Sequence, residues 1–348
     1  MPTVVTVAAP RSVSLVEEED GPVGPGEARI RTLYSGISAG TELSTYRGTS
    51  PHLTKAWDAD ARLFRDGGGD EPAYPVRNLG YEEVGEVVEV GSADAGVAVG
   101  DIVWGTWGHR TAAVLPAASV AARRLGPEAD PRIGMFSHIG AVALNAVLDA
   151  EIRVGDTVAV FGLGVPGQLV AQLARLNGGE VIAVDGIPAR RRLAADLGAA
   201  VTLDPADSPA ERIRELTAGR GADVAIEISG SYAALHEAIR SVAYNSRVCA
   251  AGFYQGPGEG LRLGEEFHHN RVQVISSQIS GVAPGLGHRW DRYRLNTTVL
   301  RLAADNRLRV LPLISHQLPY TEAAEAFRML DADPHQVLQL VLDFREAP

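Results

Sequence analysis

Residues 157–167, which read TVAVFGLGVPG, decide the fold of this chain. The first five residues form a β-rich apolar run that is typical of a buried strand, and a G-x-G-x-x-G pattern follows at once. The first glycine permits a tight turn, the second lets the backbone approach a phosphate, and the third lets a helix pack closely on the sheet. A helix that begins here would offer free N–H groups to phosphates. The stretch therefore predicts a dinucleotide-binding turn. Its predicted binding residues are Gly162, Leu163, Gly164, Val165, Pro166 and Gly167.

A second apolar run at 180–185 ends on Asp185, which lies 18 residues after Gly167. A carboxylate at this position accepts hydrogen bonds from ribose hydroxyls and repels a 2′-phosphate, so it favours NAD over NADP. Arg190, which opens an arginine triplet, is also counted with the cofactor-binding residues because it could contact such a phosphate. A solvated helix face is the alternative interpretation of the triplet.

Strand-like and helix-like runs alternate from residue 157 to 275, and this alternation predicts a doubly wound parallel sheet. The expected strands lie at 157–161, 180–185, 200–203, 223–228, 247–251 and 272–275, and the expected helices at 168–176, 191–197, 210–217 and 235–242. The first 125 or so residues contain short β-rich runs between turn residues, at 4–7, 28–31, 85–90 and 101–104. Helices at 293–304 and 321–330 and a strand at 337–342 follow the parallel series. The fold class is therefore α/β, with a small β-barrel domain beside a doubly wound sheet.

Composition excludes several classes of protein. The 348 residues carry a net charge of -11, which gives no electrostatic support for binding nucleic acid. The single cysteine, Cys249, rules out an intrachain disulfide and multi-cysteine zinc sites, and its apolar surroundings predict a buried core position. We expect a cytoplasmic protein, because neither a signal peptide nor an apolar run of about 18 residues is visible. The polar insertion at 50–78, with GGGD at 67–70, predicts a functional or disordered loop.

Three blocks resemble the medium-chain dehydrogenase/reductase superfamily, and the resemblance extends over essentially the whole chain. They are SGISAGTE at 35–42, GYEEVGEVVEVG at 80–91 and VGDTVAVFGLG at 154–164. The resemblance implies a GroES-like catalytic domain made of both chain ends, 1–138 and 283–348, with a Rossmann domain, 139–282, inserted between them. It also implies a small-molecule substrate and a homodimer, in which the strand near 272–280 extends the sheet across subunits.

The zinc-binding members of that superfamily differ from this chain at their metal ligands. Ser38 stands where they have a cysteine, and Tyr81-Glu82 stands where they have His-Glu. A further ligand position falls on His138, and the four-cysteine structural zinc lobe is absent. Catalytic zinc prefers three ligands from histidine, cysteine and carboxylates, so the sequence predicts no metal site. The blocks resemble a branch without zinc ligands that includes bacteriochlorophyllide dehydrogenase and bacterial relatives.

Without zinc, an acid/base and hydrogen-bond donors must hold the reacting oxygen. Tyr81 is the first candidate for proton transfer or oxygen orientation, and His138 is the second because imidazole titrates near neutral pH. Glu82 is expected to tune either of them, Thr41 to relay a proton, and Ser38 to join them as a former ligand position. Each also has a packing or structural interpretation. So do other residues that could reach a substrate: Glu42, His268, His269, Trp57, Trp104, Trp107 and Trp290.

The sequence therefore predicts a zinc-independent, NAD-dependent dehydrogenase. It would transfer hydride between nicotinamide and a secondary alcohol that is a polyol, a cyclitol, sugar-like or a specialised metabolite. Two alternatives stay open: an NADPH-dependent quinone or enoyl-type reductase, and a non-catalytic dinucleotide-binding protein.

Overall fold

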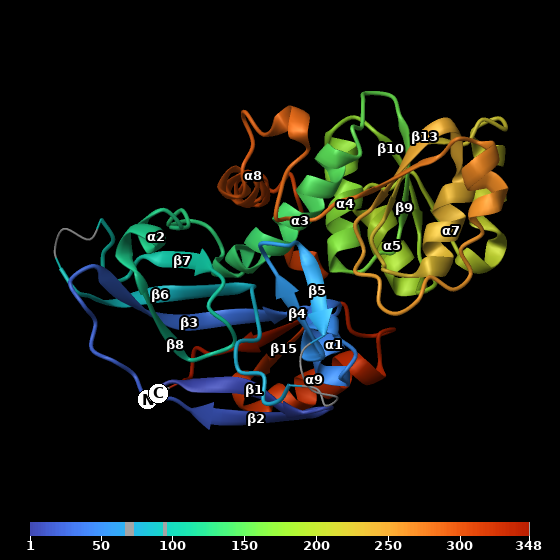
Figure 1. Ribbon diagram of the computed structural model, residues 1–348. Helices are drawn as coiled ribbons and strands as arrows, with labels where there is room; N and C mark the ends of the chain where they lie inside the picture. Colours follow the sequence, from blue (N-terminus) through green and yellow to red (C-terminus); the bar gives the residue numbers. More distant parts are fainter. Residues whose placement is uncertain (67–72, 93–95, 348) are drawn as a thin grey trace. The chain divides into compact units, whose positions relative to one another are not determined.

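The computed structural model describes residues 1–66, 73–92 and 96–347, so the GGGD motif at 67–70 lies outside the described residues. The chain forms two compact units, drawn in Figure 1. The first contains Met1–His138 and Ile314–Pro348, and the second contains Ile139–Leu313.

The second unit is built on a six-stranded sheet in the order β11-β10-β9-β12-β13-β14, and every pairing in it is parallel. This order is that of a dinucleotide-binding Rossmann sheet, which confirms the predicted doubly wound fold. The strand order reverses beside β9, so β10 and β12 flank it on opposite sides. The strands are β9 (Thr157–Phe161), β10 (Glu180–Val184), β11 (Val201–Leu203), β12 (Ala222–Glu227), β13 (Val242–Ala250) and β14 (Gln273–Ser276).

Helices surround this sheet in Figure 1, and α4 (Val165–Leu176), α6 (Pro209–Leu216) and α7 (Tyr232–Ser241) bury apolar residues. The other helical segments of this unit are α5 (Pro188–Asp196), η3 (Pro205–Asp207), the π-helical η4 (Leu263–Phe267), η5 (Pro284–Leu286) and η6 (Leu311–Leu313). The centre of the sheet is buried, and Val158, Ala159 and Val160 of β9 have no solvent-exposed surface.

Two longer helices extend the second unit beyond the sheet. A Cβ added at Gly140 of α3 (Phe136–Asp149) would lie 2.3 Å from Val299 of α8 (Arg292–Ala304), so the two helices are in close contact. Because α8 packs on α3, residues 283–313 group with the second unit. The resemblance implies that the catalytic domain resumes at residue 283, whereas the second unit extends to Leu313 and the first resumes at Ile314.

The first unit is organised around the eleven-residue strand β3 (Glu27–Ile37). β3 pairs antiparallel with β6 (Glu83–Val90), β8 (Ala112–Pro116) and β16 (Gln339–Asp343). The C-terminal strands β16 and β15 (Ile314–Pro319) thus complete a sheet begun by the N-terminal part of the chain. The remaining elements are β1 (Thr3–Ala9), β2 (Ser12–Glu17), α1 (Thr41–Arg47), η1 (Pro51–Leu53), β4 (Lys55–Asp58), β5 (Leu63–Asp66), β7 (Ile102–Gly105), α2 (Ala117–Ala121), η2 (Pro131–Met135), η7 (Tyr320–Glu322) and α9 (Ala323–Ala332).

The core of this unit joins the two ends of the chain. Buried side chains of β1 and α1 pack with those of α9 and β16, among them Val5, Leu43, Phe327 and Leu340. No helix in the described part of the chain is both long and apolar enough to cross a membrane.

Candidate active site

The glycine turn has the geometry that its sequence predicts. Gly162 has a φ of 93°, in the left-handed region that favours glycine, and its N–H donates to the carbonyl of Val184. A Cβ added at Gly167 would lie only 1.8 Å from the carbonyl oxygen of Gly162, so a side chain there would collide with backbone. Gly164 caps the N-terminus of α4, in which Val165 and Pro166 are the first two residues. Proline is compatible with this first turn because its nitrogen needs no partner there.

Asp185 holds the end of β10 against this turn. Its two carboxylate oxygens accept hydrogen bonds from the N–H groups of Leu163 and Ile187, each at 2.7 Å. The guanidinium of Arg190 lies 4.0 Å from the same carboxylate. Burial lowers the pKa of Arg190, and the negative charge of Asp185 opposes that shift. Asp185 and Arg190 therefore lie together beside the turn, as an acidic and a basic group at one site.

Tyr81, Ser38, Thr41 and His138 lie together in the first unit. The Tyr81 hydroxyl donates to Ser38 Oγ at 2.5 Å, and the Tyr81 and His138 rings meet edge to face with centroids 4.8 Å apart. The pKa of Tyr81 is raised by burial of its hydroxyl and by the carboxylates of Glu82 and Glu42, against smaller effects from Ser38 and Thr41. Tyr81 therefore stays protonated near neutral pH and can donate a hydrogen bond.

Glu82 points into the protein beside β3. A Cβ added at Gly36 would lie 2.5 Å from Glu82 Oε2 and 2.8 Å from the Gln339 amide nitrogen, so both side chains lie over this glycine. The pKa of Glu82 is raised well above its ordinary value by burial and then by Glu42 and Glu83, and Gln339 opposes the rise. Glu82 is thus favoured in its neutral form.

A chain of buried, hydrogen-bonded side chains lies behind Ser38, and the sequence did not predict it. One oxygen of Glu42 accepts the Ser38 N–H at 3.0 Å, and the other lies 2.6 Å from His109 Nε2. His109 Nδ1 lies 2.6 Å from Ser35 Oγ, which donates to Glu83 at 3.0 Å. All four members beyond Ser38 are buried. The chain fixes the backbone that carries Ser38, and so supports the partner of the Tyr81 hydroxyl.

Two members of this chain have shifted pKa values. Burial raises the pKa of Glu83 to about 7, although His109 and the N–H of Trp107 favour its charged form. For His109, burial disfavours the charged ring, but the adjacent Glu42 carboxylate prevails and raises its pKa. The strand that follows Glu82 carries Glu83, Glu86 and Glu89, so its sequence does not distinguish the buried Glu83 from the other two carboxylates.

The residues at the former metal-ligand positions do not fit a catalytic zinc. Tyr81 and Ser38 are hydrogen-bonded to each other and are poor zinc ligands. His138 and Glu82 remain as suitable kinds of donor, whereas a catalytic site needs about three.

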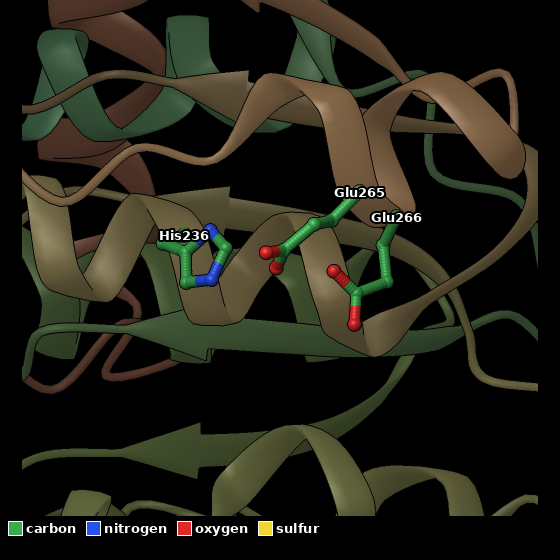
Figure 2. Close-up of side chains that lie close together, drawn as sticks. All are labelled: His236, Glu265 and Glu266. Carbon is green, nitrogen blue, oxygen red and sulfur yellow. The ribbon is translucent and has the colours of Figure 1, made fainter.

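One group with metal-ligand chemistry lies in the second unit, and it is the only such trio among residues 1–66, 73–92 and 96–347. His236 of α7 faces Glu265 and Glu266 of η4, and their ligand atoms lie within 4.8 Å of one another (Figure 2). Glu266 is also 3.3 Å from Arg240, and Glu265 is 3.8 Å from Arg262. These ion pairs account for the acidic charge, and we assign no metal to the group.

The other residues singled out by sequence contact neighbours elsewhere in each unit. Trp107 is buried and donates to Thr32, and Arg294 lies over the ring of Trp290. Trp104 is buried in β7, and His268 and His269 are exposed at the end of η4. Trp57 is half exposed on β4 and meets Phe64 of β5 edge to face.

Comparison with known proteins places this architecture in a family. D-guloside 3-dehydrogenase of Escherichia coli (strain K12) is 31% identical over 347 residues, which cover 98% of this chain and 99% of that protein. The chain belongs to the zinc-binding dehydrogenase family. As a dehydrogenase of the medium-chain type, it is a dinucleotide-dependent oxidoreductase that acts on CH–OH groups.

Other comparisons of this protein with known dehydrogenases agree with the family assignment. A sequence profile of the zinc-binding dehydrogenases matches residues 164–293. The 2-desacetyl-2-hydroxyethyl bacteriochlorophyllide A dehydrogenase of Rhodobacter capsulatus is 26% identical over 357 residues, 99% of this chain and 98% of that one, which confirms the resemblance seen in the sequence. The structure of 2R,3R-butanediol dehydrogenase from Bacillus subtilis shares the fold, with a TM-score of 0.77, 23% identity and 99% of each chain covered.

Proposed function

We propose that this dehydrogenase oxidises a secondary alcohol, or reduces the matching ketone, with NAD and without a catalytic zinc. The observation that carries the proposal is the Tyr81 hydroxyl, which is hydrogen-bonded to Ser38 and lies beside the ring of His138. The resemblance aligns these residues with the metal-ligand positions of zinc-dependent relatives, and in this proposal they offer a hydrogen-bond donor in place of a Lewis acid.

Each residue then has a distinct role. A bound nicotinamide would supply the acceptor for the hydride that leaves the carbinol carbon. The Tyr81 hydroxyl turns from Ser38 Oγ to donate to the substrate oxygen and orients it, and His138 accepts the proton of the substrate hydroxyl as the carbonyl forms. The Ser38 hydroxyl then donates to the Tyr81 oxygen and, with Thr41, holds it in place. Glu82 is a buried carboxyl group close to Tyr81, and negative charge on it raises the pKa of the phenol and so favours the protonated hydroxyl.

We propose a sugar-like or polyol substrate. A relative at 31% identity that matches 98% of this chain is a D-guloside 3-dehydrogenase, an enzyme named for a glycoside. A ring carrying several hydroxyl groups suits a site whose donors are hydroxyl and imidazole groups rather than a metal. We also propose a homodimer joined along β14, which is the terminal strand of its sheet and so offers an edge for pairing.

The choice of NAD rests on Asp185, whose carboxylate faces the glycine turn. Titration of the purified protein with NADH and with NADPH tests it. We expect NADH to bind more tightly than NADPH, because Asp185 would repel a 2′-phosphate. Asp185→Asn should reduce the difference between the two affinities. Tighter binding of NADPH by the unmodified protein would favour the quinone or enoyl-type reductase instead.

Replacing Tyr81 with phenylalanine tests the chemistry. With a panel of alkyl glycosides, polyols and cyclitols, Tyr81→Phe should lower kcat by about 10²–10⁴-fold, as expected for a lost acid/base or orienting group. NADH affinity should not change. Tyr74→Phe is the matched control, since that hydroxyl donates to the Thr45 carbonyl within the same unit and touches none of the proposed groups. An unchanged rate in Tyr81→Phe removes Tyr81 from the mechanism, and NADH binding without turnover of any compound favours a non-catalytic protein.

A further inference from the structure

Glu227 is a fully buried carboxyl group at the carboxyl end of β12. β12 and β10 are the two neighbours of β9, which leads into the glycine turn. Glu227 therefore ends the strand on one side of the turn, and Asp185 follows the strand on the other side. A carboxyl group without exposure to water needs hydrogen-bond partners, and the identity of those partners shows what Glu227 organises.

The partners of Glu227 come from two loops that follow neighbouring strands. Oε1 accepts the N–H of Ser229 at 2.8 Å and also the Ser229 hydroxyl. Oε2 accepts the N–H of Gly230 at 3.2 Å and the hydroxyl of Tyr254. Burial raises the pKa of Glu227, and these four donors oppose the rise. The carboxyl group thus joins segment 228–231, after β12, to segment 252–254, after β13.

These loops are in direct contact with the glycine turn. A Cβ added at Gly162 would lie 2.6 Å from the Ser229 Cβ. One added at Gly252 would lie 2.3 Å from the Gly230 nitrogen and 2.8 Å from Glu227 Oε2. No space separates the turn from segment 228–231, so any movement of this segment changes the surface beside Gly162.

A doubly wound sheet binds one nucleotide half on each side of its strand reversal. Asp185 belongs to the half formed by β9, β10 and β11, which receives the adenosine, and Glu227 belongs to the half formed by β12, β13 and β14. We propose that Glu227, with Tyr254, is a positioning residue for the nicotinamide half of the dinucleotide, because it holds segment 228–231 against the glycine turn. The inference rests on the dinucleotide binding proposed above.

Calorimetric titration of the full-length protein with NADH and with 5′-AMP, which carries only the adenosine half, separates the two sides. Glu227→Gln turns one acceptor oxygen into an amide donor that faces backbone N–H groups. We expect it to weaken NADH binding by about tenfold or more and to leave AMP binding unchanged. Tyr254→Phe should weaken NADH binding in the same selective way but less, because one donor of four is removed.

Tyr232→Phe is the matched control for Tyr254→Phe. Its ring lies 5.2 Å from that of Tyr254, but its hydroxyl donates to the Gly256 carbonyl and not to Glu227. It should bind both probes as the unmodified protein does. If circular dichroism shows that Glu227→Gln does not fold, the titrations of Tyr254→Phe decide whether the inference holds.

Two results overturn the inference: wild-type NADH affinity in the variants, or equal weakening of NADH and AMP. Failure of the unmodified protein to bind either probe would instead reject the dinucleotide site itself, and the inference with it.

Discussion

Among single residues, Glu83 carries a distinct pH dependence of stability. Its folded pKa of about 7 lies above the ordinary 4.5, so the folded protein retains a proton that the unfolded chain releases. A carboxyl group with a raised pKa stabilises the fold below about pH 4.5 relative to higher pH, and this contribution is lost as pH rises through 7. Glu82 has a shift of the same sign.

We therefore expect the free energy of unfolding of the unmodified protein to fall, relative to Glu83→Gln, by about 2–3 kcal/mol between pH 4.5 and 7. The amide in the variant stays neutral throughout this range. Urea unfolding at a series of pH values measures the difference, and Glu128→Gln, at an exposed position, should match the unmodified protein. A parallel pH profile for Glu83→Gln would contradict the assignment.

Local sequence could predict the residues of the glycine turn, because Gly162, Gly167 and Asp185 act through backbone geometry within one βαβ unit. It also placed Tyr81, Ser38 and His138 in one group through the resemblance to a family. It could not predict the chain from Glu42 through His109 to Glu83, because those contacts join residues 67 and 74 positions apart. Nothing in the sequence shows that these charged groups are buried together.

At the scale of elements, the start of α4 distinguishes two roles of glycine. Gly167→Ala places a Cβ against the backbone of Gly162, whereas a Cβ at Gly164 would meet only Pro166, at 3.8 Å. We expect Gly167→Ala to lower Tm and destabilise the fold by about 1–3 kcal/mol, as overpacking does. Gly164→Ala should keep its Tm but lose NADH affinity, because its methyl group occupies the approach of the pyrophosphate. Thermal melts and NADH titration check both, and wild-type affinity in Gly164→Ala would contradict the phosphate-binding geometry.

The hairpin of β4 and β5 shows where element prediction failed. Its residues do not alternate between apolar and polar faces, and every residue of β5 is exposed, so no buried face marked it as a strand. The ring contact between Trp57 and Phe64 crosses the hairpin and could not be read from either strand alone. The parallel strands were predictable because burial on both faces leaves continuous apolar runs.

For the whole molecule, the fold class followed from the alternation of strands and helices in the middle of the chain and from the resemblance of its two ends to one domain. The placement of α8 did not follow, because it depends on a contact between Gly140 and Val299, which are 159 positions apart (299 − 140). The first unit supplies the groups proposed to hold the substrate oxygen, and the second supplies the glycine turn for the dinucleotide. The central claim is that these two sets of groups support hydride transfer between the substrate and the nicotinamide without a metal.

Turnover of metal-depleted protein tests this claim most directly. The protein is treated with a chelator, its zinc content is measured, and NAD⁺ reduction is followed with a glycoside or polyol that the untreated protein oxidises. We predict far less than one zinc per chain before treatment and the same kcat afterwards. Stoichiometric zinc whose removal abolishes turnover, and whose return restores it, would contradict the account.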